Sequence, residues 1–386
     1  MAYSKFSGEV PRILILRSQY WLDGACEAAA TTLGWECASV PTLMVGAQTR
    51  EQTATLLDAI VHTRPDFILS INLAGMDVDG MWARFFDDLG VPHVTWFVDN
   101  PRTIIMDRKT YASPHSVALT WDESYAPFLR ESGFPHVHWL PLAAESSCFN
   151  AEPMDSPEHS TTFTGNSMVA FATGARGTIL ADPRLAHWAD KDFVRDHVSR
   201  EKLGQGLHAI IGADALEPLN PEQRRHLEMF FFLDCTRQLR HDAIAALQDQ
   251  QVTVRGDDGW RAITDRAGPP LNYLEQLPAF YRNCAINLNF TSAQMPSAAN
   301  QRVFDCPAAG GFLLTDAQTD LTRLFAKDEY ASFTSIGDCA EKIRHYRANP
   351  AERIEIARKA RRRILKEHTY VDRLKTIAQW VMDAFT

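Results

Sequence analysis

The sequence of 386 residues lacks Cys-x-x-Cys pairs, and none of its apolar runs approaches the length of a membrane span. Its seven cysteines are scattered, a pattern typical of reduced thiols used as small core residues. The first 18 residues contain no long apolar segment of the kind found in secretion signals. We therefore expect a cytoplasmic protein with at most peripheral membrane contact.

Positive charge is also scarce, because 39 Lys and Arg residues stand against 48 Asp and Glu residues, a net charge of −9. This balance disfavours a nucleic-acid partner. A basic run at 358–368, "RKARRRILKEH", departs from it. Glu352 and Glu355 precede the run and Glu367 lies within it, which favours a solvated helix face over a nucleic-acid or lipid site.

Short apolar runs alternate with helical segments in the first part of the chain. This alternation predicts an α/β fold in which helices cover both faces of a parallel sheet. Ligands bind such sheets beyond the carboxyl ends of the strands. Polar residues end or follow the runs at 12–18, 64–72, 91–101 and 116–124. They are Ser18, Gln19, Tyr20, Asn72, Asp77, Asp99 and Asp122.

A polar, proline-containing stretch interrupts the alternation, and a second series of strands begins near residue 161. We predict two doubly wound, Rossmann-like domains joined by this linker. A long helical insert is expected at about 174–248. The predicted parts are the N-terminal domain 1–145, the linker 146–160, the C-terminal domain 161–368 and a closing helix 369–386 that packs back on the N-terminal domain.

One segment of the second series combines a helix with charged residues. The sequence predicts a helix from about 298 to 309, ended by Gly310 and Gly311 in a left-handed cap. Arg302 and Asp305 share a face of it, and its N-terminus is suited to an anion such as a diphosphate. Asp305 could accept hydrogen bonds from the two hydroxyls of a ribose. The alternative is a weak, solvated ion pair.

The segment "INLNFTSAQMPSAANQRVFDCPAAGGFLLTD" at 286–316, with residues 324–374, resembles the C-terminal half of the CgeB-like glycosyltransferases, named after a spore-maturation protein. The runs "VPHVTWFVDNP" and "LPLAAESSCF" resemble the N-terminal domain that accompanies it. The resemblance implies a GT-B fold: two facing Rossmann-like domains, with the nucleotide sugar on the C-terminal one and the acceptor on the N-terminal one.

The resemblance also implies a hexosyltransferase-like activity. A sugar would pass from a nucleoside-diphosphate sugar, most often a UDP-sugar, to a hydroxyl of a protein, a surface glycan or a small molecule. Related GT-B enzymes carry a Glu-x7-Glu motif whose second acid binds the donor ribose. Asp305 matches that second acid, whereas Ser297 stands where the first acid would contact the sugar. Asn289, Asn300 and Arg302 are the further donor contacts that we expect, with Asn300 and Arg302 at the phosphates.

Two turns carry further donor candidates. Gly165, Asn166 and Ser167 follow the first strand of the second series, and Gly256 and Asp257 follow the next strand. Their backbone N–H groups could contact the phosphates or the base, although such turns are also common without any ligand. No Asp-x-Asp motif is evident where a metal-dependent transferase would need one, so we expect no metal and no cofactor.

Asp99 is the second catalytic candidate beside Arg302. It follows a strand of the N-terminal domain and is expected to face the interdomain cleft. If the anomeric centre is inverted, this carboxylate could take the proton of the acceptor hydroxyl. The alternative is an aspartate that only caps a turn before Pro101.

Two other functions fit the same residues. A nucleotide-sugar epimerase on this fold would need no acceptor, and a non-catalytic protein that binds glycans or a partner would need no acid at Ser297. A dehydrogenase is disfavoured, because no Gly-x-Gly-x-x-Gly follows the first strand.

Overall fold

A computed structural model describes residues 3–18, 20–42, 49–106 and 108–386; the candidate Gln19 lies outside the described residues. The chain divides into two compact units. The first consists of Met1–Pro141 with Tyr370–Thr386, and the second of Leu142–Thr369. Among the described residues no helix is both long enough and apolar enough to cross a membrane.

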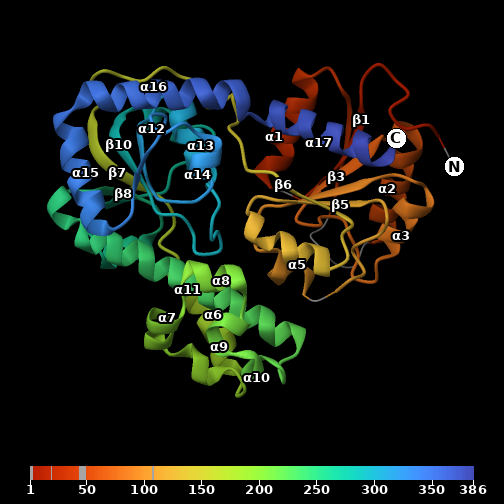
Figure 1. Ribbon diagram of the computed structural model, residues 1–386, viewed down its shortest axis with the longest axis horizontal. Helices are drawn as coiled ribbons and strands as arrows, with labels where there is room; N and C mark the ends of the chain where they lie inside the picture. Colours follow the sequence, from red (N-terminus) through yellow and green to blue (C-terminus); the bar gives the residue numbers. More distant parts are fainter. Residues whose placement is uncertain (1–2, 19, 43–48, 107) are drawn as a thin grey trace. The chain divides into compact units, whose positions relative to one another are not determined.

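The first unit contains a sheet of six parallel strands in the order β2-β1-β3-β4-β5-β6 (Figure 1). The three strands β3, β4 and β5 are buried along their whole length, which explains why they stand out as apolar runs in the sequence. The strands are β1 Arg12–Arg17, β2 Glu36–Pro41, β3 Phe67–Ile71, β4 His93–Phe97, β5 Ser116–Thr120 and β6 His136–Trp139.

Helices accompany this sheet, and the last helix of the chain is one of them. This helix, α17, packs against α1, with the rings of Trp21 and Tyr370 5.8 Å apart in an edge-to-face contact. The helices are α1 Trp21–Thr32, α2 Arg50–Thr63, α3 Met81–Asp88, α4 Pro101–Ile105, η1 Glu123–Tyr125, α5 Ala126–Glu131 and α17 Tyr370–Phe385.

The second unit contains another sheet of six parallel strands, in the order β12-β11-β10-β7-β8-β9. The two parallel sheets with their helices confirm the predicted α/β class. The strands are β7 His159–Thr164, β8 Thr253–Arg255, β9 Ala267–Gly268, β10 Cys284–Asn289, β11 Leu313–Asp316 and β12 Ala331–Phe333. Its sheet-associated helices are η3 Gln248–Gln250, η4 Asp258–Ala262, α12 Leu277–Arg282, α13 Gln301–Ala308, α14 Leu321–Leu324, α15 Ile336–Ala348 and α16 Pro350–Glu367.

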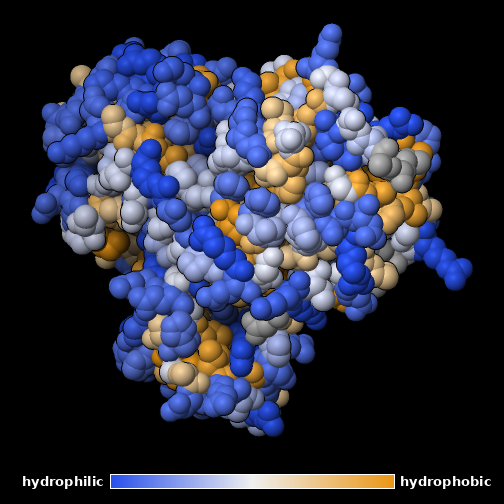
Figure 2. All heavy atoms as spheres, turned by 45° about the vertical axis from the view of Figure 1, so that its right-hand side comes forward, coloured by the Kyte–Doolittle hydropathy of each residue, from blue (hydrophilic) through white to orange (hydrophobic). Residues whose placement is uncertain are grey.

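The remaining helices form what we call the helical lobe, residues 169–246, with an apolar core of its own (Figure 1). In Figure 2 it shows a hydrophobic area among hydrophilic side chains. Its long last helix, α11, ends in the core of the sheet, where Ala243 and Ile244 are buried. The lobe comprises α6 Val169–Ala181, η2 Ala186–Ala189, α7 Lys191–His197, α8 Arg200–Gln205, α9 His208–Ile211, α10 Ala213–Leu216 and α11 Pro221–Ala246.

Helix α13 is shorter than the sequence predicts. It begins at Gln301 rather than near residue 298, because Asn300 still has an extended backbone with ψ 173°. Pro307 lies inside its last turn. Gly310 adopts the expected left-handed conformation, with φ 83°, and Gly311 donates its N–H to the carbonyl of Cys306, 2.9 Å away.

Candidate functional site

The order of strands in the second unit reverses at β7. The chain adds β8 and β9 on one side of β7 and then places β10, β11 and β12 on the other side. Ligands of open α/β sheets bind at the carboxyl ends of the two strands that flank such a reversal, here β7 and β10. The candidates Gly165, Asn166 and Ser167 follow β7, and Asn289 ends β10.

The turn after β7 is closed by an aspartate from the neighbouring strand. Ser167 is fully buried, and its backbone N–H and its hydroxyl each donate a hydrogen bond of 2.6 Å to the carboxylate of Asp257. Burial acts to raise the pKa of Asp257, but these hydrogen bonds outweigh it and leave the pKa below its usual value. Asp257 is therefore an ionised group that links the turn after β8 to the turn after β7 by hydrogen bonds.

Two glycines allow these turns to approach each other. A Cβ on Gly256 would lie 2.2 Å from the carbonyl oxygen of Gly165, which also accepts a 2.8 Å hydrogen bond from the indole of Trp260. A Cβ on Gly165 would lie 2.7 Å from Nη2 of Arg302. Neither position has room for a side chain, so the turn and the guanidinium are in direct contact.

Arg302 is half-buried and lies over the ring of Phe163, with Cζ 5.4 Å from the ring centroid. Its Nη1 donates a 2.7 Å hydrogen bond to the side-chain oxygen of Asn289. Within the described ranges it forms no ion pair with a carboxylate. A charged guanidinium with neutral partners can accept an anion without losing an existing pair.

The N-terminus of α13 is tied to the end of β10 by a pair of amides. Asn289 and Asn300 exchange two side-chain hydrogen bonds, of 2.9 and 3.0 Å, and Asn289 also donates one to the hydroxyl of Thr315. Asn300 therefore makes no side-chain cap on its own helix. Ser297 lies half-buried in the preceding loop, where its carbonyl accepts a 3.1 Å hydrogen bond from the backbone N–H of Asp320.

Asp305 lies one turn deeper and is only 1% exposed. One carboxylate oxygen accepts a hydrogen bond from the hydroxyl of Tyr273, 2.5 Å away, and the other accepts a 2.9 Å bond from the amide of Gln301. Burial raises the pKa of Asp305 to about 7, against the effect of these hydrogen bonds. A ribose could reach this carboxylate only by replacing one of the two donors.

Sequence reasoning did not identify Tyr273 and Gln301, and it also missed two arginines from the helical lobe. Arg200, on α8, pairs with Asp316 at the end of β11, with 2.5 Å between Nη1 and Oδ2. Arg240, on α11, donates a 2.8 Å hydrogen bond to the carbonyl of Asn166. Their distance in the sequence from the recognisable turns explains why no motif revealed them.

Asp99 belongs to the first unit and lies after β4. One of its oxygens accepts hydrogen bonds from the hydroxyl of Tyr20, 2.5 Å away, and from the amide of Asn72, 2.8 Å away. Burial, followed by the charge of Asp99, raises the pKa of Tyr20. Asn72 has φ 52° and Leu73 has φ 60°, so the turn after β3 holds two non-glycine residues in a left-handed conformation. Such strain is typical of functional turns.

The contacts thus join eight of the candidates in one network at the carboxyl edge of β7, β8 and β10. Asp305 lies deeper on α13, Ser297 belongs to the loop before that helix, and Asp99 belongs to the first unit. The joined residues are Gly165, Asn166, Ser167, Gly256, Asp257, Asn289, Asn300 and Arg302.

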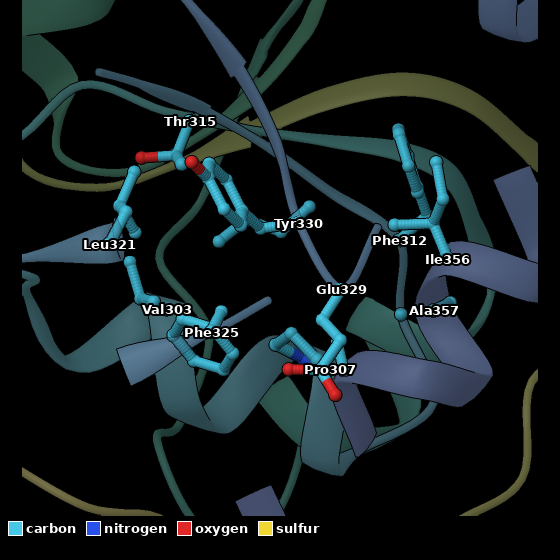
Figure 3. Close-up of a pocket in the computed structure, with 13 residues that line it drawn as sticks. Val303, Pro307, Phe312, Thr315, Leu321, Phe325, Glu329, Tyr330, Ile356 and Ala357 are labelled. Carbon is cyan, nitrogen blue, oxygen red and sulfur yellow. The ribbon is translucent and has the colours of Figure 1, made fainter. Parts of the chain in front are cut away.

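An apolar cavity lies on another face of α13, lined by Val303 and Pro307 among others (Figure 3). Its volume is about 20 Å³, room for a single water molecule and not for a nucleotide. The carboxylate of Glu329 at its rim is paired with Arg363. This cavity is a packing defect behind the helix.

The basic run on α16 is neutralised by acidic neighbours. Arg361 pairs with Glu152 at 2.6 Å, and Arg363 pairs with both Glu329 and Glu367. Lys359 likewise pairs with an aspartate. These pairs support the solvated helix face over a nucleic-acid site. In the part of the chain that the structure describes, no three His, Cys, Asp or Glu residues come together as a metal site.

Solved structures with the same architecture are those of GT-B glycosyltransferases. The sucrose-phosphate synthase of Thermosynechococcus elongatus matches with a TM-score of 0.56 and 9% identity, over 96% of this chain and 99% of that one. HepE of Anabaena, in complex with UDP and glucose, matches with a TM-score of 0.53 and 11% identity, over 96% and 99%. An alpha-glucosyltransferase in complex with UDP and a 13-mer DNA matches with a TM-score of 0.54 and 9% identity, over 97% and 100%.

These likenesses show that the chain has the GT-B fold, as the resemblance implied. Residues 236–379 also match the family model described as "Glycosyl transferase-like". That segment contains β8, β10 and α13 and therefore most of the network around Arg302. None of the curated proteins matches the chain.

Proposed function

We propose that this protein is a glycosyltransferase of the CgeB-like group. It would move a sugar from a nucleoside-diphosphate sugar, foremost a UDP-sugar, to a hydroxyl of a protein, a surface glycan or a small molecule, in the cytoplasm and without a metal ion. The match of residues 236–379 to the glycosyltransferase-like family model supports this proposal. So does the fold that the chain shares with proteins solved in complex with UDP.

The observation that carries the proposal is the environment of Arg302. Its guanidinium touches a glycine turn, lies over an aromatic ring and has no carboxylate partner in the described part of the chain. It lies against the turn after β7 and the end of β10, where open α/β sheets bind ligands, and in the first turn of α13. In the proposed reaction it binds the diphosphate and stabilises the charge that develops as the nucleotide departs.

The proposed reaction breaks the bond between the anomeric carbon and the phosphate oxygen, and UDP leaves with the bonding electrons. The acceptor oxygen forms the new bond to that carbon and loses its proton. Asp99 is the proposed acceptor of this proton if the anomeric configuration is inverted. Asp305 is proposed to bind the ribose, whose hydroxyl would replace that of Tyr273.

A thermal-shift experiment with UDP, GDP, ADP, CDP and dTDP tests the donor site. A ligand that binds the folded protein raises its unfolding temperature, and at equal concentration the tighter ligand raises it more. We expect the largest rise with UDP for the wild-type protein and for R344A, which removes an exposed arginine of α15. R302A should lose the rise. No rise with any of the five nucleotides, or an unchanged rise in R302A, would contradict the proposal.

A further inference from the structure

Arg240 is a buried arginine that forms no ion pair with a carboxylate of the described residues. Its side chain is 7% exposed, although it belongs to a long helix that connects the helical lobe to the sheet. Its hydrogen bonds go to the carbonyl oxygens of Asn166, at 2.8 Å, and Phe290, at 3.4 Å. Neither partner carries a charge. Burying a charge without an ion-pair partner costs free energy. A buried arginine without a carboxylate partner therefore points to an anionic ligand that binds beside it when the protein functions.

The pKa of Arg240 reflects this situation. Burial and then the positive charge of Arg302 lower it to about 9, although the charges of Asp316 and Asp257 act in the opposite direction. The neighbouring Arg200 differs, because it forms an ion pair with Asp316. An anion near Arg240 would relieve both the lost solvation and the repulsion from Arg302.

Arg240 and Arg302 approach the same elements from two different helices. Their Cζ atoms lie 5.9 and 5.4 Å from the centroid of the Phe163 ring. Arg240 binds the carbonyl of Asn166, and Arg302 reaches the adjacent Gly165. Two cations on one turn suit a ligand with two neighbouring negative groups, as a diphosphate has.

We infer that Arg240 is the second phosphate-binding cation of the donor site, and that the helical lobe supplies it. The inference rests on the proposed function and deepens it, since it gives the segment 169–246 a part in donor binding. With Arg302 alone the site would bind one phosphate group about as well as two. With Arg240 it favours a nucleoside diphosphate over the monophosphate, and hence releases UDP less readily than UMP.

Calorimetric titration with UDP, UMP and uridine tests this preference in the full-length protein. The variant is R240Q, and its matched control is R237Q, on the same helix, where Arg237 pairs with Asp234 at 2.7 Å. We expect R240Q to bind UDP about 10- to 100-fold more weakly, the range for losing a charge-assisted hydrogen bond. The affinity for UMP should fall less than about 3-fold, and R237Q should bind all three as the wild-type protein does.

R240K separates a loss of charge from a structural effect, because lysine keeps the positive charge but lacks the planar guanidinium group. We expect it to fold and to restore part of the preference for UDP over UMP. An unchanged ratio of UDP to UMP affinity in R240Q, or an equal loss for uridine, would overturn the inference and leave the proposed function standing. If the wild-type protein bound no UDP, both would fall together.

Discussion

Both sheets are parallel and doubly wound, but they differ in strand order and carry opposite chemistry at their carboxyl edges. In each unit the first strand, β1 or β7, has strands added first on one side and then on the other. The residues joined after β1, β3 and β4 are a phenol, an amide and a carboxylate around Asp99. The second unit instead brings Arg302 and Arg240 to the turn after β7.

This difference separates two contributions: the strand order sets where a ligand site lies, and the side chains set which ligand it attracts. In both sheets the strand order reverses beside the first strand, and open α/β sheets bind ligands at the carboxyl end of such a reversal. A carboxylate with hydroxyl and amide partners repels phosphate and suits a neutral hydroxyl, whereas unpaired arginines attract phosphate. The difference in charge therefore supports the proposed roles of Asp99 at the acceptor and Arg302 at the donor.

Replacement of Asp99 should have the largest effect on turnover. D99N keeps the shape of the side chain but removes the proposed proton acceptor, so release of UDP from UDP-glucose should slow by about 100-fold or more. Affinity for UDP should not change, because that nucleotide is assigned to the second unit. D58N, which alters an exposed aspartate of α2, is the control. A rate for D99N equal to that of the control would leave Asp99 as a turn residue only.

Filling the space at Gly165 should weaken donor binding without affecting the first unit. In G165A the new methyl group would lie 2.7 Å from Nη2 of Arg302 and 2.9 Å from the Phe163 ring, so the guanidinium must move. We expect affinity for UDP to fall about 10-fold, the loss of one charged contact. G174A is the matched control, since a Cβ there meets no atom within 4 Å. Equal calorimetric affinities in the two variants would contradict the assignment of this turn.

The smallest effect concerns Asp305 and pH. The pKa of Asp305 is about 7 in the folded protein, against 3.8 for an aspartate of the unfolded chain, so the folded state binds the proton more tightly. The free energy of unfolding should therefore fall as pH rises between these values, by about 1 kcal/mol from pH 6 to pH 7.5. D305N should lack this part of the pH dependence in urea unfolding. Parallel pH profiles for D305N and the wild-type protein would contradict the account of this buried carboxyl.

The sequence predicts much of the fold because the central strands are buried on both faces and read as apolar runs. It does not reveal β2, whose residues are largely exposed at the edge of the sheet. Residues 174–248 read as one long helical stretch, but in the lobe that stretch breaks at Gly206 and Gly212, which have positive φ. Single residues of this kind interrupt a helix without changing the composition around it.

The candidate site was predictable only where residues close in sequence stay close in space. Arg302 and the Gly165 turn could be named from local patterns, although their contact joins residues far apart in the chain. Arg240 could not be named, because an arginine on a helix is usually solvated and its burial depends on packing between the lobe and the sheet. The partnership of Tyr273 with Asp305 likewise depends on tertiary structure.

Release of UDP from UDP-glucose, compared between the wild-type protein, R302A and R344A, measures the central claim most directly. If the uncompensated guanidinium stabilises the departing nucleotide, R302A should be slower by about 100-fold or more, while R344A keeps the wild-type rate. Equal rates in all three proteins would mean that the basic edge of the second sheet takes no part in the chemistry.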